Sequence, residues 1–478
     1  MLDVGGKKGY FEPGFMPELW IFAVQAYNDP GGNGPPAKNY NRGIGHHLNV
    51  PWPTACAALG IARSCTTVGA ARVAELTGQS FCGGAVAEVA DVAEVAAPRS
   101  VLSEACNLNG RLVQADHGGR CVCLPAWRGA SCGELALLPA HAGAGLHAGS
   151  NMSSWGGAVA FDAPSGRWVM FGNELVGGCG INSWESNSRI VRASTADLDT
   201  AFVVDAVVLP SFASEPSLAK LGEQWLLYSI GNASSSKPPR TDCVEGYSPS
   251  SAPPPGTGGN FVGFVPVSVS TAATLTGEWT LQSTFGNGDF NPSPLVFPNG
   301  TTLLMWRHLA RVHMVRADDI GGPFAFNGSD SGCPVGAGDS SPGCRWWHLF
   351  PPTADQNGLE DPFIYEQPDP SGSDSTAVTY HALFHDHKHF GGHGYSRDAI
   401  SWTFSDVAPY SNNVTFTDGS TISMQRRERP HLVFDDRGMI THLTNGVQPP
   451  PTAAKSPPTS GVKLQNDYVY TLLQPVQT

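Results

Sequence analysis

Asp361-Pro362-Phe363-Ile364 places a carboxylate and a proline directly before a short apolar stretch, and related segments recur along this chain of 478 residues. The other copies are Glu215-Pro216-Ser217-Leu218, Asn291-Pro292-Ser293-Pro294, Glu428-Arg429-Pro430-His431-Leu432 with one residue inserted, and a degenerate first copy, Trp155-Gly156-Gly157-Ala158-Val159. Their starts lie roughly 60–75 residues apart, and repeats on this scale that are built of short strands indicate a propeller. An acid at the entrance of each innermost strand would collect on one central face.

A second element recurs late in four of the repeats and supports the same count. It runs from a small residue through Ser, Ala or Asp into a turn that ends at an aromatic residue, in residues 192–202, 269–279, 315–324 and 395–404. Such side chains suit a turn between the outer strands of a small antiparallel sheet. The sequence therefore predicts an all-β fold, a five-bladed β-propeller over residues 145–476.

The composition agrees with many short strands joined by turns. The chain contains 56 Gly and 39 Pro, and only 14% of its residues are charged, which argues against a helical bundle. A net charge of −13 without any basic run makes nucleic acid an unsuitable partner. No stretch approaches the roughly 18 apolar residues of a membrane helix, so no membrane span is expected.

The region before the propeller divides in two. Residues 1–100 form a poorly defined segment of unknown function, partly helical because the spacing of its apolar residues between Thr67 and Ala97 suits helices. Residues 101–135 contain Cys106, Cys121, Cys123 and Cys132 and resemble the second half of an epidermal-growth-factor-like (EGF-like) module, with four of its six cysteines. The resemblance implies the disulfides Cys106–Cys121 and Cys123–Cys132.

Other features favour the secretory pathway or the extracellular space. Cys333 and Cys344 can close a local loop, and Cys179 and Cys243 lie in loops that leave the first two blades. Five Asn-X-Ser/Thr sequons are candidate glycosylation sites: Asn151, Asn232, Asn299, Asn327 and Asn413. Paired cysteines together with sequons are typical of secreted proteins, although the first residues contain no clear signal peptide and we expect a truncated start.

The two repeated elements resemble those of the five-bladed propeller glycoside hydrolases of families 32, 43 and 62, over about residues 150–475. Enzymes of the family 43 type cleave glycosidic bonds with inversion, using an Asp base, a second Asp that tunes it and a Glu acid from three blades. The resemblance implies Asp361 as the tuning aspartate and Glu428 as the acid. Asn291 occupies the slot of the base and cannot accept a proton from water, so Asp289 or Glu215 are the alternatives; the first repeat offers no acid.

Further residues are candidates for substrate contact. His385 lies in a histidine-rich stretch, residues 381–393, that suits substrate contact, a metal ion or a structural role. Arg427 beside the acids could hold their charges in place or bind a carboxylated sugar, and Arg307 and His308 end a strand of the third blade. Trp155 could stack on a sugar ring, and Asn291 is a further candidate for substrate contact. A structural calcium ion is the one cofactor considered, since some propeller hydrolases carry one.

Three functions remain open from the sequence. The first is a secreted glycoside hydrolase that acts on a poly- or oligosaccharide through acid and base carboxylates. The second is a carbohydrate-binding propeller without activity, which Asn291 and the missing acid of the first repeat favour. The third is an extracellular adhesion or matrix component in which the propeller is a scaffold.

Overall fold

The structure, a computed structural model, describes residues 2–4, 7–9, 102–115, 118–231, 243, 266–285, 291–308, 311–324, 346–350, 358–368, 378–450 and 467–478. The chain forms two compact units, residues 1–96 and 97–478. In the first unit, β1 (Leu2–Val4) pairs antiparallel with β2 (Lys7–Gly9). The helices predicted within residues 1–100 lie outside the described residues.

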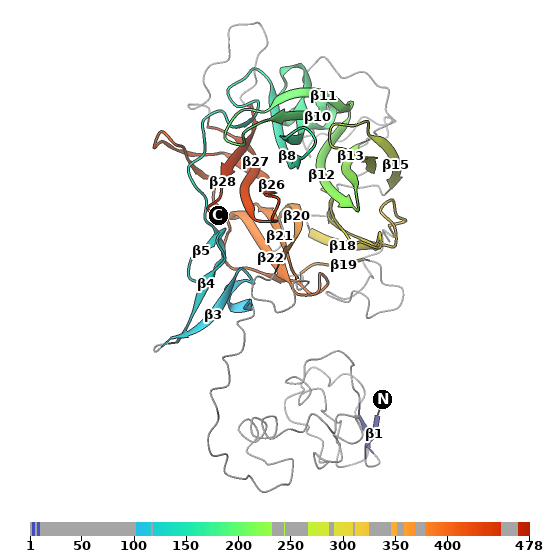
Figure 1. Cartoon of the computed structure of the whole chain (residues 1–478), viewed down its shortest axis with the longest axis vertical. Coiled ribbons are helices and arrows are strands. Elements are labelled where there is room, and N and C mark those ends of the chain that lie inside the picture. Colours follow the sequence, from blue (N-terminus) through green and yellow to red (C-terminus); the bar gives the residue numbers. More distant parts are fainter. Residues whose placement is uncertain are drawn as a thin grey trace, which may run out of the picture. The chain divides into compact units, whose positions relative to one another are not determined.

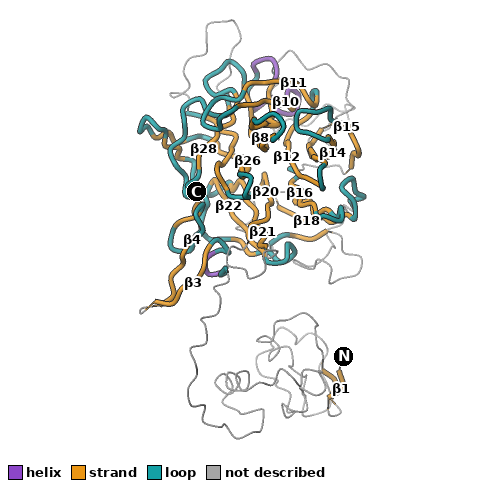
Figure 2. Tube along the Cα trace, in the orientation of Figure 1, coloured by secondary structure: helices purple, strands orange, loops and turns teal. Residues whose placement is uncertain are grey.

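The second unit contains five four-stranded antiparallel sheets, and the all-β prediction of a five-bladed propeller is confirmed (Figures 1 and 2). Blade one has β8 (Ser153–Asp162), β9 (Arg167–Leu175), β10 (Ser188–Thr195) and β11 (Val203–Leu209). Blade two has β12 (Ala213–Leu221), β13 (Gln224–Gly231), β14 (Val267–Ala272) and β15 (Thr280–Phe285). Blade three has β16 (Ser293–Val296), β17 (Thr302–His308), β18 (Arg311–Ala317) and β19 (Trp346–His348). Blade four has β20 (Leu359–Pro368), β21 (Val378–Asp386), β22 (Phe390–Ser396) and β23 (Thr403–Phe404).

Blade five joins the two ends of the propeller. It combines β26 (Arg426–Phe434), β27 (Ile440–Gln448) and β28 (Tyr470–Pro475) with an outer strand from the start of the domain, β7 (Gly145–Leu146). Thr471 pairs with Leu146 and Leu472 with Gly145. The sequence placed the closing strand at residues 468–473, but that segment is the third strand of the blade, and the two-residue β7 closes the ring.

Neighbouring blades pack through apolar side chains on their facing sides. The inner strands contact one another in the cyclic order β8, β12, β16, β20, β26 and back to β8. Between blades three and four, for example, Met305 and Met314 pack with Phe384 in one buried cluster. Blades five and one share Val433, Leu473 and Met170. Burial of these side chains holds the ring together.

The helical elements are short. Blade one carries the 3₁₀ turns η3 (Val176–Gly178) and η4 (Ile181–Ser183) and the single turn α4 (Trp184–Asn187). Among the described residues, no helix has the length and apolar character to cross a membrane.

Residues 102–135, here named the disulfide module, precede the propeller. They contain η2 (Glu104–Cys106), the hairpin of β3 (Gly110–Ala115) and β4 (Gly118–Cys123), and the pair β5 (Trp127–Arg128) and β6 (Glu134–Leu135). The disulfides Cys106–Cys121 and Cys123–Cys132 are present, as is Cys179–Cys243, so these pairings are confirmed. Cys333 and Cys344 lie outside the described residues. The EGF-like character of the module stays a prediction.

The disulfide module packs directly on the propeller. Trp127 is buried and stacks at 5.0 Å from His393 of blade four, and Arg397 donates to the carbonyl of Leu102. Leu135 joins the apolar cluster between blades four and five, and a hairpin of β24 (Asn413–Thr415) and β25 (Thr421–Ser423) lies before β26.

Four of the inner strands contain a bulge at the repeated motif. The pairing with the second strand shifts between Ser154 and Gly157 in β8, and equivalent shifts occur in β12, β20 and β26. The residue at the bulge has a positive φ in all four strands: Gly156, Glu215, Asp361 and Arg429. Side chains other than glycine rarely adopt this conformation, and such residues cluster at functional sites.

Candidate active site

The repeated motif brings one residue from each blade to the centre of the ring. Gly156, Glu215, Asn291, Asp361 and Arg429 line a small central cavity of about 10 Å³, together with the residues that follow them. A cavity of this size holds about one water molecule. The centre is therefore filled by side chains.

Arg429 occupies this centre and binds residues in three other blades. Its guanidinium forms an ion pair with Glu215 and donates to the carbonyl of Trp155 at 3.2 Å, and its backbone N–H donates to Asp361 at 3.1 Å. Burial lowers the pKa of Arg429 to about 9, which leaves it charged at neutral pH. A Cβ on Gly156 would lie 2.9 Å from the Cβ of Arg429, so glycine in blade one makes room for this side chain.

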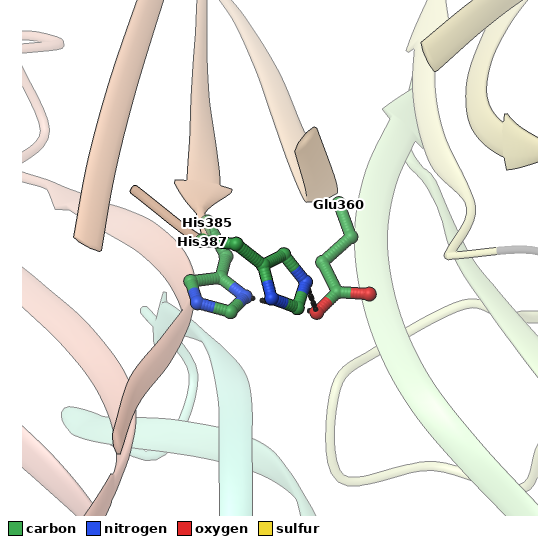
Figure 3. A group of neighbouring side chains, drawn as sticks. All are labelled: Glu360, His385 and His387. Atoms are coloured by element: carbon green, nitrogen blue, oxygen red, sulfur yellow. Dashed lines mark hydrogen bonds and ion pairs between the residues drawn. The ribbon is translucent and has the colours of Figure 1, made fainter. Parts of the chain in front are cut away.

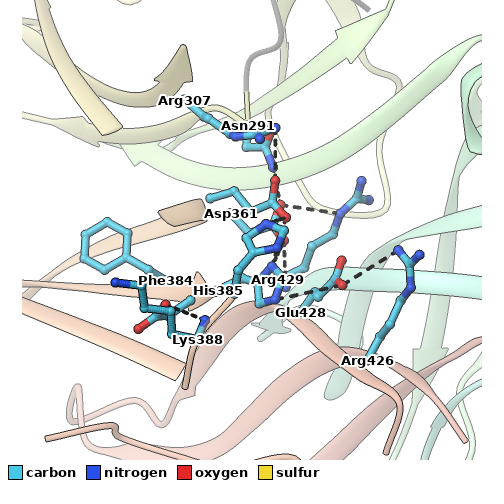
Figure 4. Close-up of polar contacts among 12 residues, drawn as sticks. Asn291, Arg307, Asp361, Phe384, His385, Lys388, Arg426, Glu428 and Arg429 are labelled. Atoms are coloured by element: carbon cyan, nitrogen blue, oxygen red, sulfur yellow. Dashed lines mark hydrogen bonds and ion pairs between the residues drawn. The ribbon is translucent and has the colours of Figure 1, made fainter. Parts of the chain in front are cut away.

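Asp361 lies beside this pair and accepts hydrogen bonds on both oxygens. The Asn291 amide donates to one oxygen and the Arg429 backbone to the other (Figure 4). Asp361 is only 6% exposed. Burial, and after it the negative charge of Glu360, raises the pKa of Asp361 to about 8, so its carboxyl is largely protonated at neutral pH.

Two glutamates stand one residue before the bulge and are more accessible. Glu360 on β20 and Glu428 on β26 have side chains 15% and 14% exposed. They occupy equivalent positions in neighbouring blades, since Asp361 and Arg429 follow them. The structure therefore places Glu428 beside the ion pair of Arg429 and Glu215. Arg429 holds the axial position that the sequence analysis assigned to Glu428.

His385 on β21 connects the two glutamates. Its Nδ1 lies 3.0 Å from Glu360, and its Nε2 lies 3.9 Å from Glu428 (Figures 3 and 4). Burial by itself would lower its pKa, but the hydrogen bond to Glu360 and the surrounding carboxylates raise it to about 9. His385 is therefore an imidazolium at neutral pH, hydrogen-bonded to Glu360 through Nδ1 and within ion-pair distance of Glu428 through Nε2.

Glu360 contacts three basic side chains. Besides His385, it contacts His387 at 2.7 Å (Figure 3) and Arg307 at 3.0 Å. Burial favours its protonated form, but these hydrogen bonds and charges outweigh burial and lower the pKa of Glu360 far below its usual value. Glu360 is therefore ionised at neutral pH.

Glu428 has a weaker set of partners. Arg426, on the exposed side of β26, approaches it at 3.8 Å (Figure 4). Burial raises the pKa of Glu428, the charge of His385 opposes this shift, and Glu360 adds to it, so the net direction is upward. The two glutamates thus have pKa values that move in opposite directions.

Glu360, Asp361, His385 and Glu428 have donor atoms within 4.8 Å of one another, and Glu360, His385 and His387 form a second such group. These donors could surround a cation. Calcium, however, takes six to eight oxygen ligands, and the charged imidazolium already sits among the carboxylates. The positive and negative charges of these residues therefore neutralise one another in an ion-pair network. A bound calcium ion stays a prediction.

Two residues that the sequence predicted for substrate contact, Arg427 and Trp155, lie away from the carboxylates. Arg427 is buried and turned away from the carboxylates: it donates to Asn445 and Gln474 and to the carbonyl of Ser411. Its expected contact with the acids is wrong, because successive side chains of a strand point to opposite faces and place Arg426, not Arg427, beside Glu428. Trp155 is 2% exposed and packs in the core, so it offers no surface for sugar stacking.

Arg307 contacts Glu360, and the following residue, His308, ends β17. The histidine-rich stretch divides by position along β21 and β22. His381 and His393 are fully buried, stacked on each other, and burial lowers the pKa of both. His389 contacts Asp386. Within this stretch, His385 and His387 are the histidines that reach the carboxylates of Glu360 and Glu428.

Among the glycosylation candidates, Asn151, Asn299 and Asn413 are exposed. Asn232 and Asn327 lie outside the described residues, as does Asp289. Glu360 and Arg426 are the site residues that the sequence reasoning missed. Aligning the repeats on their prolines, instead of on their acids, would have paired Glu360 with Glu428.

No family model matches this chain, and no curated protein matches it. Its structure is similar to Zg3597, a family 117 glycoside hydrolase of the marine bacterium Zobellia galactanivorans, with 13% identity, 71% of this chain and 89% of that chain covered, and a TM-score of 0.42. It is also similar to the catalytic domain of a family 62 α-L-arabinofuranosidase of Coprinopsis cinerea, with 12% identity, coverages of 68% and 90%, and a TM-score of 0.41. The α-L-arabinofuranosidase PaAbf62A of Podospora anserina gives 10% identity, coverages of 68% and 91%, and a TM-score of 0.42. Similarity at this level carries no functional argument, and the function of this chain must be inferred from its own side chains.

Proposed function

We propose that this protein is a secreted, carbohydrate-active enzyme that hydrolyses a glycosidic bond in a poly- or oligosaccharide. The observation that carries the proposal is the pair Glu360 and Glu428: both are partly exposed, both contact His385, and their pKa values move in opposite directions. Two carboxyls whose surroundings separate their protonation states are the arrangement that acid catalysis at neutral pH requires.

Glu428 is the general acid in this proposal. Burial favours its protonated form, and its accessible carboxyl can give the proton to the oxygen of the departing sugar. Arg426 next to it can orient the leaving group. Asp361 stays protonated beside the pair, so it adds no further negative charge at neutral pH.

Glu360 is the ionised partner. One of its oxygens lies within 4.8 Å of an oxygen of Glu428, so both carboxyls can contact the same glycosidic bond. We therefore assign Glu360 the attack on the anomeric carbon while the C–O bond breaks and Glu428 protonates the leaving oxygen. Water then releases the sugar from Glu360, and Glu428 takes back a proton. Inversion, which the sequence resemblance implied, would instead use Glu360 to activate a water molecule.

Glu215 has no part in this scheme, because its carboxylate is paired with Arg429. The base that the sequence reasoning sought in Glu215 or Asp289 is replaced by Glu360.

The test is release of reducing ends from a panel of neutral and acidic polysaccharides by the full chain. We expect turnover on at least one of them, and a loss of about 10²–10⁴-fold in kcat for Glu428→Gln and for Glu360→Gln. Glu223→Gln is the matched control, since that side chain is fully exposed in a turn of blade two. Full activity in either site variant would reject the assignment.

The second candidate is a carbohydrate-binding propeller without turnover. The neutralisation of Glu215 by Arg429 and the amide of Asn291 in an acid position favour it. Calorimetric binding of an oligosaccharide, without any product after prolonged incubation, would support this function over hydrolysis.

A further inference from the structure

A groove separate from the carboxylate site lies where the disulfide module meets blade five. It has a volume of about 450 Å³. Its walls come from Arg128 and Glu134 of the module, from the connecting residues 137–139, and from residues 408–415. The volume falls within the roughly 300–1,000 Å³ of sites that hold small ligands. We name it the module groove.

The floor of the module groove is rigid and its wall is partly apolar. Gln474 is buried, donates to the carbonyl of Leu138 at 2.8 Å and accepts from Arg427 at 2.9 Å. Tyr410 is also buried, and Arg427 lies over its ring at 4.9 Å. Leu138 is 42% exposed in the wall. A fixed polar floor beside apolar side chains suits a ligand with hydroxyl groups and an apolar face, as sugars have.

The rim of the groove carries a glycosylation sequon. Asn413-Val414-Thr415 forms β24, and both Asn413 and Thr415 line the groove. Asn413 is exposed, and its side-chain amide makes no hydrogen bond with any residue that the structure describes. Val414 is buried, which fixes the strand and holds the asparagine at the rim.

We propose that Asn413 carries an N-linked glycan whose first sugars lie in the module groove and connect the disulfide module to the propeller. In the modification, the side-chain nitrogen of Asn413 bonds to the anomeric carbon of a lipid-pyrophosphate-linked oligosaccharide, supplied during secretion. The bond from that carbon to the pyrophosphate breaks, the lipid pyrophosphate leaves, and the nitrogen loses one proton. This inference requires passage through the secretory pathway, which the disulfides favour, and it does not depend on the hydrolase activity.

Asn299 provides the internal control. It belongs to the sequon Asn299-Gly300-Thr301 and is exposed in the turn between β16 and β17, where its side chain accepts from the backbone of Thr301 at 3.0 Å. A glycan there would stand in solvent.

The experiment uses the full chain behind a secretion leader in a glycosylating eukaryotic host, followed by peptide mass spectrometry. We expect a glycan at Asn413. Under native conditions, a peptide N-glycosidase should release it at least about tenfold more slowly than the glycan of Asn299, the ratio for a sugar that must leave the groove at a cost of about 1.4 kcal/mol. After denaturation the two rates should be equal.

A substitution in the wall of the module groove tests whether packing of the glycan in the groove is what slows its release. Leu138→Asp should speed release at Asn413 and leave release at Asn299 unchanged. Absence of a glycan at Asn413, whether or not Asn299 is modified, would overturn the proposal. Equal native release rates would overturn it too, since the glycan would then lie outside the groove.

Discussion

Replacing Arg429 by methionine removes the cation at the centre of the propeller. The side chain is 8% exposed, forms an ion pair with Glu215, and donates to Trp155 and Ser214. Methionine keeps much of the volume but leaves the carboxylate of Glu215 buried without its partner. Breaking a buried ion pair in this way costs about 3–5 kcal/mol of unfolding free energy, because the remaining charge is buried away from water and has no partner to compensate for the lost hydration.

A second substitution distinguishes the effect of losing the whole ion pair from the effect of leaving the Glu215 carboxylate unpaired. Arg429→Met combined with Glu215→Leu removes both charges, and replacing a buried pair by apolar residues of similar size is often neutral. We expect the double variant to recover most of the loss. Arg437→Met is the matched control: that side chain is 75% exposed and pairs with Asp435, so its loss should lower the unfolding free energy far less than the loss of Arg429.

Equilibrium urea unfolding, followed by tryptophan fluorescence, measures the wild type and the three variants. A cost for Arg429→Met below that of the exposed control would contradict the prediction. A double variant no more stable than Arg429→Met would contradict it as well, because the buried charge of Glu215 would then not be the source of the cost.

Three further predictions concern other parts of the molecule. The pKa of Asp361, raised to about 8 by burial and neighbouring carboxylates, means that the folded protein keeps a proton that the unfolded chain releases near pH 4. The contribution of Asp361 to the unfolding free energy therefore falls as pH rises from about 4 to about 8, by at most about 1.4 kcal/mol per pH unit. Asp361→Asn should flatten this pH dependence, measured as urea midpoints at several pH values. An unchanged slope would contradict the prediction. Cys179→Ser with Cys243→Ser opens a loop spanned by 64 residues and should cost about 2–5 kcal/mol in the same assay, and an unchanged midpoint would argue against the bond. Gly145→Ala places a Cβ against the carbonyl of Thr471 in the third strand of blade five. It should lower Tm more than Gly143→Ala, because Gly143 also has a positive φ but has open space around it. Equal Tm shifts would mean that backbone strain alone, without the clash, sets the loss of stability.

The repeats predicted the propeller because each blade begins with a related local sequence. A proline after the axial residue in four blades and the turn late in four of the repeats recur at the same phase, so five sheets could be counted from the sequence. The closing strand could not be predicted: Gly145–Leu146 has two residues, no alternation, and a partner more than 300 residues away.

The site was predicted less well, and the bulge explains why. The sequence reasoning aligned Glu428 with Asp361 and treated Arg429 as an insertion, whereas the positive φ of Arg429 gives it the position of Asp361. Once the prolines define the alignment, Glu360 matches Glu428. Alternation along β26 would likewise have favoured Arg426 over Arg427 as the neighbour of Glu428. Contacts such as Arg429 with Glu215, between blades two and five, depend on the closed ring and leave no trace in local sequence.

The way β7 completes blade five has a consequence for synthesis. A ribosome delivers residues 145–146 long before residues 470–475, so the nascent chain carries an unpaired strand edge until β28 has emerged. Exposed strand edges invite pairing with other chains, and contacts between distant residues form slowly. Translation must therefore pass residue 475 before the ring can close, and a product that stops earlier would present open β-edges to its neighbours instead of a sealed ring.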